Sequence, residues 1–353
     1  MFYISIFSCV ILISSMSYAL SFSRALKILF LGFGVFLLFL ASSLQYGVGT
    51  DYFNYQSIYN GVVSHDLFFR KGELLFYYLY EFLIGFDLGD QSVFVFTSFF
   101  QSLTLFLIFK MLFEKGYGVH ILLLFYLFAT GMFHNQMNGI RTFTAVYFFI
   151  ASFLFISDRK FFLGAVFYLF AVLSHSTALF LFPLMILPSV FWRFISANRI
   201  IIFFLANLFW LFGLGNTLVI YLVQNLAPFY SHYLHLTDSP ANILNILSKA
   251  YWLPLYLWFL IMYRGVNFSD FSGRLVGIWV LSSGLYFSLF YTTIFFRAHH
   301  YFSFFMLIPL YFVFIKSNLS HRIVISVYSL FPFILKVLIF PKGEYLYDSV
   351  LFR

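Results

Sequence analysis

The sequence predicts an all-α integral membrane protein, a bundle of about twelve transmembrane helices (range eleven to thirteen) with an outward-facing polar cavity. Of its 353 residues, 63% are hydrophobic and only 9% are charged. A soluble domain could not bury so much apolar surface, because its exterior must carry polar groups. The 57 Phe and 26 Tyr residues suit a lipid-facing surface with aromatic side chains at the membrane interfaces. Residues 1–353 are therefore expected to form a single polytopic membrane domain.

Twelve apolar segments have roughly the length needed to cross about 30 Å of hydrocarbon. The first is read as an uncleaved span, because its basic neighbours Arg24 and Lys27 follow the apolar run, whereas a signal peptide begins with them. Segment 74–88 has Glu81 and Asp87 within it and Glu73 and Asp90 beside it, so it is expected to lie in the interface or re-enter rather than form a thirteenth span. The twelve predicted spans are 2–20, 28–45, 92–113, 118–133, 141–157, 161–174, 177–192, 200–226, 250–263, 275–294, 299–315 and 323–340.

The charges favour a topology with both termini outside. Threading the spans alternately, with Arg24 inside, leaves only Glu114, Asp158 and Asp270 as cytoplasmic acids. An excess of Lys and Arg in cytoplasmic loops is the usual orientation signal. The cytoplasmic basic residues, twelve of twenty, are then Arg24, Lys27, Lys110, Lys115, Arg159, Lys160, Arg193, Arg199, Arg264, Arg274, Lys316 and Arg322.

The basic residues that fall on the outer side against this bias include Arg70, Lys71, Arg141, Lys249 and Arg297. Arg141 and Arg297 directly adjoin apolar spans. An arginine toward the centre of a span costs about 2.5–3.5 kcal/mol on insertion scales, so such residues usually face a bundle interior or a water-filled cavity. The alternative is that they snorkel to the outer headgroups.

Polar clusters also gather on the predicted outer side. Segment 47–52 (GVGTDY) opens outer loop 46–73, where glycines permit tight turns that would hold Asp51 near the membrane. A simple turn, with Asp51 capping the next helix, is the competing interpretation. Segment 134–141 (HNQMNGIR) carries more hydrogen-bonding side chains, including Asn135 and Asn138, than a helical hairpin needs.

Two further clusters contain histidine. Segment 174–177 (SHST) separates two apolar stretches, and His175 is either a structural group or a catalyst. Segment 296–302 places His299 and His300 next to each other, about 100° apart on a helix, so they cannot form an i, i+4 metal pair. No zinc motif occurs, and we expect neither metal nor cofactor. Outer loop 227–249 adds residues suited to sugar stacking or to an interfacial helix: Tyr230, His232, Tyr233, His235 and Asp238.

These clusters, in order along the chain, resemble the EpsG-like, Wzy-type polymerases. The matching elements are V-G-T-D-Y-x-x-Y over 48–55, Glu73 ahead of the following segment, N-x-x-R over 138–141, S-H-S-T-A over 174–178 and R-x-x-x-Y over 297–301. Thr142 follows Arg141 where the resemblance would lead us to expect Gln or a similar polar residue. The resemblance implies a glycosyltransferase that joins undecaprenyl-pyrophosphate-linked oligosaccharide units into O-antigen, capsule or exopolysaccharide on the outer face of the bacterial inner membrane. No nucleic acid is expected as a partner, and a chain-length regulator in the membrane is a candidate partner.

The expected site follows from this chemistry. Arg141 and Arg297 would pair with the donor pyrophosphate, because the guanidinium fork binds phosphate bidentately. His175 would act as general base on the acceptor hydroxyl, with Asp51 as the alternative base. The expected substrate-binding residues are Tyr52, Tyr55, Asn135, Asn138, Arg70, His300 and Tyr301.

Three other classes stay open. A GT-C-type glycosyltransferase would also place an acid in its first outer loop, but paired carboxylates and a large soluble domain are absent. An O-antigen ligase shares the chemistry. A flippase or transporter would need charges along a path through the bilayer or an internal repeat, and neither is evident.

Overall fold

The structure is a computed structural model that describes residues 2–226, 247, 250–291, 296–339 and 346–352. Within these residues the chain is helical, and the only pairing of strand type is an isolated bridge between Gln45 and Ser349. The all-α class is thus confirmed for the part described. Contacts divide the chain into two compact units, residues 1–186 with 327–353 and residues 187–326.

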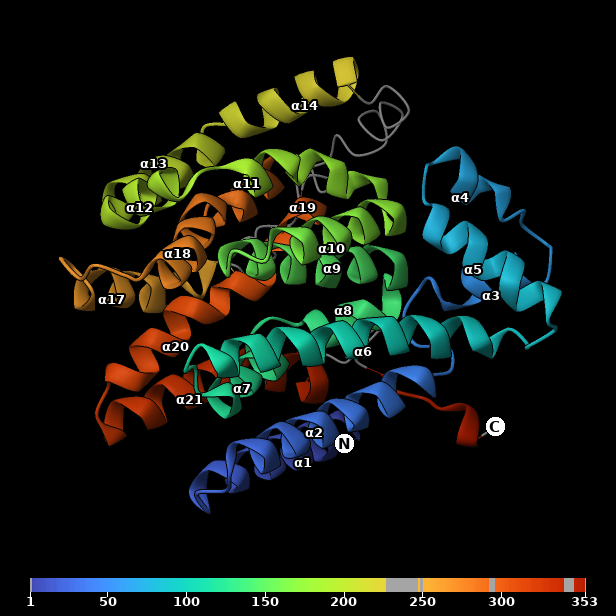
Figure 1. Cartoon of the computed structure of the whole chain (residues 1–353), viewed down its shortest axis with the longest axis horizontal. Helices are drawn as coiled ribbons and strands as arrows, with labels where there is room; N and C mark the ends of the chain where they lie inside the picture. Colours follow the sequence, from blue (N-terminus) through green and yellow to red (C-terminus); the bar gives the residue numbers. More distant parts are fainter. Residues whose placement is uncertain (1, 227–246, 248–249, 292–295, 340–345, 353) are drawn as a thin grey trace. The chain divides into compact units, whose positions relative to one another are not determined.

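Unit 1 is built on long helices that pack side by side (Figure 1). α9 packs against α10 and α6, while α2 packs against α6 and α1. Every residue of α9 from Phe143 to Phe155 is buried, as expected for a helix that is apolar on all sides. The long helices are α1 (Phe2–Ala19), α2 (Arg24–Ser43), α6 (Gln91–Glu114), α9 (Ile140–Ser157) and α10 (Phe161–Ser174).

Short helices complete unit 1. Three of them, α3 (Tyr52–Tyr59), α4 (Asp66–Arg70) and α5 (Leu74–Gly85), lie together at one end of the long helices (Figure 1). α5 has 12 residues, a length of about 18 Å that cannot cross about 30 Å of hydrocarbon. This length agrees with the expectation that segment 74–88 is not a full span. The others are α7 (Val119–Ala129), α8 (Met132–Asn138), the 3₁₀ helix η1 (Ser176–Leu181) and α11 (Phe182–Ile186).

The two chain ends meet the start of loop 46–73. The ring of Tyr347 stacks on Phe2 at 3.7 Å between centroids, and its hydroxyl donates to the Ala41 carbonyl at 3.0 Å. The Tyr46 amide donates to the Asp348 carbonyl at 3.0 Å. Both ends of the chain therefore lie at the end of unit 1 where α2 finishes.

Unit 2 contains shorter and more irregular helices. α13 and α14 are bent by 66° at Gly213, whose φ of +75° few other residues adopt readily. Its elements are α12 (Ser189–Ala197), α13 (Arg199–Leu211), α14 (Leu214–Leu226), α17 (Leu253–Met262), α18 (Asp270–Ser282), η3 (Leu285–Phe290), α19 (Phe296–Phe302), η4 (Ser303–Met306) and α20 (Leu307–Lys316). α21 (Leu319–Ile334) begins in unit 2 and continues into unit 1 from residue 327. Unit 1 also contains the short π-helix η5 (Leu335–Ile339) and the 3₁₀ helix η7 (Val350–Phe352).

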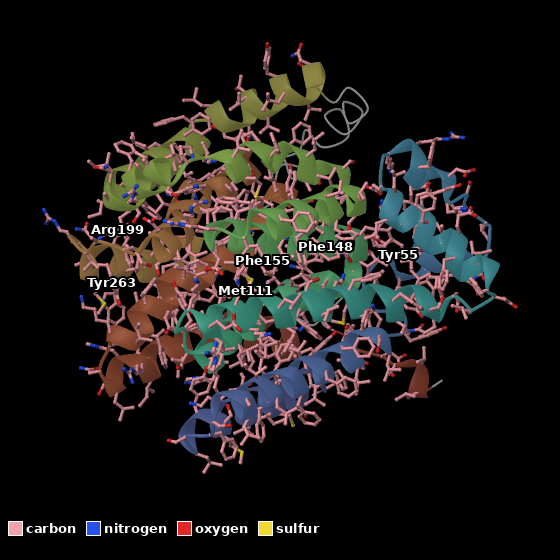
Figure 2. All side chains as sticks on the ribbon, in the orientation of Figure 1. Tyr55, Met111, Phe148, Phe155, Arg199 and Tyr263 are labelled. Atoms are coloured by element: carbon pink, nitrogen blue, oxygen red, sulfur yellow. The ribbon has the colours of Figure 1, made fainter. Side chains whose placement is uncertain are left out.

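Basic side chains cap helix ends within unit 2. The Arg199 guanidinium donates to the carbonyls of Ser196, at 2.6 Å, and Tyr263, and Lys316 donates to the Met262 carbonyl at 2.7 Å. Arg199 and Tyr263 are labelled together in Figure 2. A cation at a helix C-terminus satisfies carbonyls that have no partner within the helix and opposes the helix dipole. These basic residues thus stabilise the ends of α12 and α17.

The described residues contain seven helices long and apolar enough to span a membrane, or nine if each bent pair is one span. The chain is accordingly a multi-pass membrane protein. In their described residues, the twelve predicted spans lie largely on helices, but the helices α7, α10 and α17 are only 10 to 14 residues long. The count of about twelve spans stays a prediction.

Ion pairs join one end of unit 1. Asp158, between α9 and α10, pairs with Lys115 and with Lys160, the latter at 2.8 Å. Arg24 lies 3.8 Å from Glu114 at the end of α6. All five residues belong to the predicted cytoplasmic set. The residues predicted to lie outside, from loop 46–73, the α8–α9 junction and the end of α10, meet at the opposite end.

Candidate functional site

Glu73 is the centre of a buried polar cluster in unit 1. Its carboxylate has no exposed surface, and each of its oxygens binds a different partner. Oε2 accepts a hydrogen bond from Nη1 of Arg141, and Oε1 contacts Nδ1 of His175. Arg141 and His175 keep about a fifth of their side chains exposed, at 21% and 19%. The cluster is therefore anchored inside the protein and accessible at its two basic members.

Breaks in three helices bring these residues together. Gly72, with φ of +72°, turns the chain from α4 to Glu73, which occupies the N-cap position of α5. Arg141 lies in the first turn of α9, directly after the junction with α8 at Gly139. His175 ends α10 in an extended conformation, with φ of −155° and ψ of 115°, before η1 begins. Each residue stands at a helix end, where polar groups can be satisfied without burying a charge in mid-span.

The Glu73 carboxylate is ionised in this setting. Burial by itself would raise the pKa of Glu73, but the hydrogen bond to His175 and the charges of His175, Arg141 and Lys71 outweigh it and lower that pKa. An ionised carboxylate only accepts hydrogen bonds, so the proton shared with His175 is on Nδ1. In a neutral His175 the lone pair is then on Nε2. Glu73 thus selects the tautomer that can act as a base through Nε2.

Two aromatic residues hold the Arg141 guanidinium from other sides. Its central carbon lies 4.8 Å from the ring centroid of Phe68, a cation–π contact. Tyr55, on α3, also hydrogen-bonds to Arg141, and the Tyr80 hydroxyl donates to the Tyr55 carbonyl at 3.1 Å. Burial raises the pKa of Tyr55 even though Arg141 opposes the shift, so the phenol stays neutral. Figure 2 shows Tyr55 at the end of unit 1 formed by α3, α4 and α5.

A second junction lies beside the first. The Oδ1 atom of Asn138, the last residue of α8, accepts hydrogen bonds from the backbone amides of Thr50 at 2.7 Å and Asp51 at 3.0 Å. Asp51 occupies the N-cap position of α3, but its side chain makes no capping hydrogen bond. The capping interpretation is therefore wrong for the Asp51 carboxylate, which is half-buried and not used by the helix.

Comparison with protein-family models decides the family. The model of the EpsG family matches residues 27–349, which are most of the chain and include Asp51, Glu73, Asn138, Arg141 and His175. The chain belongs to the EpsG family. No curated protein and no solved structure is significantly similar to it. The resemblance predicted from the polar clusters is thus confirmed, and the EpsG family indicates a membrane protein of the polysaccharide polymerase type.

Unit 1 brings together three of the four residues that we expected to be catalytic in this EpsG-family chain. Arg141 and His175 both contact Glu73, and Asp51 acts electrostatically on Tyr55 together with Arg141 and Glu73. The fourth, Arg297, belongs to α19 in unit 2, and its side chain lies outside the described residues.

The expected substrate-binding residues of unit 1 differ in their surroundings. Tyr52 is fully buried, stacks on Phe94 at 4.3 Å and donates its hydroxyl to Gln91 at 2.9 Å. Tyr55 is 3% exposed and interacts with Arg141. Both tyrosines therefore pack inside the protein, and neither presents an accessible ring. Arg70, at the end of α4, is exposed, and Asn135 is half-buried in α8.

The remaining expected residues belong to α19 or to the second outer loop. His300 is half-buried and Tyr301 is 3% exposed, both in α19. Tyr230, His232, Tyr233, His235 and Asp238 lie outside the described residues.

Glu73 is the residue that sequence reasoning missed as a site member. The signal was present in the chain, because Glu73 is an acidic residue directly ahead of an apolar helix on the side where Arg141 and His175 were also expected. It was noted as part of the family resemblance but given no chemical role. Without knowledge of its burial, an acidic residue in an outer loop is interpreted only as part of the charge distribution that sets the topology.

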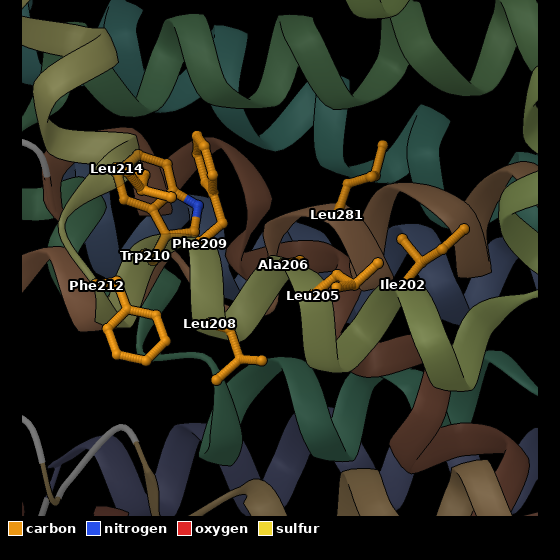
Figure 3. A pocket seen from close by; sticks show the side chains of 9 residues that line it. All are labelled: Ile202, Leu205, Ala206, Leu208, Phe209, Trp210, Phe212, Leu214 and Leu281. Atoms are coloured by element: carbon orange, nitrogen blue, oxygen red, sulfur yellow. The ribbon is translucent and has the colours of Figure 1, made fainter.

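Two features bear on other kinds of site. A pocket of about 580 Å³ in unit 2 is lined by nine residues of α13, the α13–α14 bend and α18 (Figure 3). None of the nine is charged or carries a hydroxyl group, so this pocket has no acid, base or nucleophile. Among the described residues, no three His, Cys, Asp or Glu side chains converge as a metal site would require.

Proposed function

We propose that this EpsG-family protein is a glycosyltransferase that polymerises undecaprenyl-pyrophosphate-linked oligosaccharide repeat units into a surface polysaccharide such as O-antigen, capsule or exopolysaccharide. The observation that carries the proposal is the buried Glu73 carboxylate, which binds Arg141 through one oxygen and His175 through the other. This arrangement combines a tautomer-fixed base with a fixed positive charge. Transfer of a glycan from a pyrophosphate carrier requires both functions.

In the proposed reaction, the acceptor hydroxyl on the non-reducing end of one lipid-linked unit attacks the anomeric carbon of the donor chain. Its proton passes to Nε2 of His175 as the new carbon–oxygen bond forms. The bond between the anomeric carbon and the pyrophosphate oxygen breaks, and its electron pair stays with the undecaprenyl pyrophosphate. Pyrophosphate is already a good leaving group, so the reaction needs no Lewis acid or strong proton donor.

The charge of the cluster changes in the direction that this reaction needs. With neutral His175, the negative charge of Glu73 and the positive charge of Arg141 cancel. When His175 accepts the acceptor proton, the cluster becomes positive as negative charge develops on the departing pyrophosphate. An interaction that strengthens only as charge develops lowers the barrier without tightening substrate binding.

We place the cluster on the outer, periplasmic or extracellular face of the bacterial inner membrane, in a chain of about twelve spans with both termini outside. The distribution of charges within unit 1 supports this placement. Arg24, Lys115 and Lys160 gather with acids at one end, whereas Glu73 and its partners lie at the other. The positive-inside rule assigns the first of these ends to the cytoplasm.

Arg297 of α19 is proposed as a second ligand of the pyrophosphate. An outward-facing polar cavity also stays part of the proposal. Asn135, Arg70, His300 and Tyr301 stay proposed contacts to the oligosaccharide. A membrane protein that regulates chain length is a proposed partner.

The surface glycan of a deletion strain tests the function directly. Loss of the gene should leave single repeat units on the carrier or acceptor, and plasmid-borne wild-type protein should restore long chains. Absence of any repeat unit would indicate a flippase or an assembly transferase. Accumulation of polymer that stays on the lipid carrier would indicate a ligase. Either of these two results would contradict the proposal.

A further inference from the structure

The carboxamide oxygen of Asn138 joins α8 to loop 46–73 through several hydrogen bonds. Besides the amides of Thr50 and Asp51, it accepts a hydrogen bond from the Thr50 hydroxyl at 3.2 Å. The carboxamide nitrogen of Asn138 has no partner within the described residues. Three donors therefore converge on one oxygen, which fills the place that an external anion or a capping side chain would otherwise take.

The loop approaches Asn138 so closely that it must have glycine at position 49. A Cβ atom at Gly49 would lie 2.6 Å from Oδ1 of Asn138 and 2.8 Å from its Cβ, well inside van der Waals contact. Gly49 also has φ of +80°, and Gly47 has φ of +58°. At Gly47 the added atom would come no closer than 3.4 Å, to the ring of Phe53. The two glycines thus share a backbone requirement, and only Gly49 has a steric requirement set by Asn138.

We propose that Asn138 is a positioning residue that fixes segment 47–51, and with it the Asp51 carboxylate, against the start of α9. Only two residues separate Asn138 from Arg141, so the same short segment of chain holds Asp51 through one contact and Glu73 through the other. The position of Asp51 relative to Arg141 is thereby fixed. This role in catalysis rests on the proposed function, whereas the local contact does not.

In this role, the oxygen of the Asn138 side chain makes the positioning contacts and the nitrogen does not. Asn138→Asp keeps an oxygen acceptor of the same shape, whereas Asn138→Leu keeps the volume and removes every acceptor. Direct binding of a sugar by the carboxamide nitrogen would make the Asp variant as defective as the Leu variant. The pair of substitutions therefore separates positioning from substrate contact.

The test measures amide hydrogen exchange of the peptide containing Thr50 and Asp51 in the purified full-length protein, together with glycan chain length in complemented cells. Exchange at these two amides should be slow in wild type and Asn138→Asp and faster by about tenfold in Asn138→Leu, because the loss of a typical hydrogen bond has about that effect. Long chains should be kept by the Asp variant and lost by the Leu variant. Unchanged exchange in Asn138→Leu, or equal defects in both variants, would overturn the proposal.

Two glycine substitutions provide a matched control if Asn138→Leu does not fold. Gly47→Ala and Gly49→Ala both add a Cβ at positive φ, but only the second collides with Asn138. Exchange at Thr50 and Asp51 should therefore rise more in Gly49→Ala, and equal rises would contradict the role of Asn138. Amide hydrogen exchange can be measured without any polymerisation. Its result therefore tests the contact of Asn138 even if the wild-type protein is not a polymerase.

Discussion

Replacing Glu73 by Gln should damage both stability and activity, for two separable reasons. Glu73 is fully buried, and removing one member of a buried charge pair typically costs about 3–5 kcal/mol because the other charge is left uncompensated. Since Arg141 keeps 21% of its side chain exposed, water can solvate it in part, and we expect the lower value, about 3 kcal/mol. Gln can also donate to Nδ1 of His175, which would move the imidazole proton to Nε2 and remove the base. Activity should fall by about 10²–10⁴.

A double substitution separates the two effects. Removing both charges in Glu73→Gln/Arg141→Gln leaves no uncompensated ion, so the unfolding midpoint should recover toward wild type while polymerisation stays absent. The assays are thermal unfolding of the purified protein in detergent and chain length of surface glycan at matched protein levels. A Glu73→Gln variant with wild-type stability and long chains would refute the reasoning, because Glu73 could then be neither the counter-ion nor the group that orients His175.

The Glu73 carboxylate determines how the free energy of unfolding should change with pH. The pKa of Glu73 is lower in the folded protein than its ordinary value. The stability it contributes is therefore fully present above about pH 4.3, the ordinary glutamate value, and is lost as pH falls through the folded-state value. The stability difference between wild type and Glu73→Gln should be present at neutral pH and shrink in acid, as Glu73 is protonated. A difference that disappears near neutral pH would contradict an ionised Glu73.

Further predictions concern the other site residues. Arg141→Ala and Arg297→Ala should each leave membrane-inserted protein that makes mostly single-unit glycan, a loss of about 10²–10³ in rate, and lysine at either position should restore little because it lacks the bidentate fork. His175→Ala should reduce the rate by about 10²–10⁴. Long chains from His175→Ala but none from Asp51→Asn would transfer the role of base to Asp51. Polymerisation by the purified protein should persist in excess EDTA, and loss restored by one divalent ion would contradict a metal-free reaction.

Much of the fold was predictable because it follows from composition and charge. Apolar segments of span length must be helical in a membrane, since a helix satisfies its own backbone groups. The described residues of the twelve predicted segments lie largely on helices, and α5 has the short length expected for segment 74–88. What hydropathy could not supply was the length of each regular helix. Breaks such as Gly213, between α13 and α14, depend on local packing, including a hydrogen bond from Tyr291 to the Leu211 carbonyl.

The candidate site was predictable in its location and less so in its chemistry. Arg141 was recognisable because a charge beside an apolar span needs a reason to be there. His175 was recognisable because it lies in a polar break between two apolar stretches. Their common partner was not, because Glu73 is one of several acids in or near loop 46–73 and only tertiary packing buries it. Tyr52 shows the opposite case. A tyrosine beside a polar motif suggests sugar binding, yet its ring packs on Phe94.

Polymerisation by the purified protein is the most direct test of the central claim, that the Glu73–Arg141–His175 cluster joins lipid-linked repeat units. Wild-type and His175→Ala proteins, reconstituted in liposomes with an undecaprenyl-pyrophosphate-linked oligosaccharide, should be compared for glycan length and for released undecaprenyl pyrophosphate. The account predicts a ladder of longer chains from wild type, with one carrier released for each bond formed, and almost none from His175→Ala. Equal ladders from both proteins, or no ladder from wild type, would contradict it.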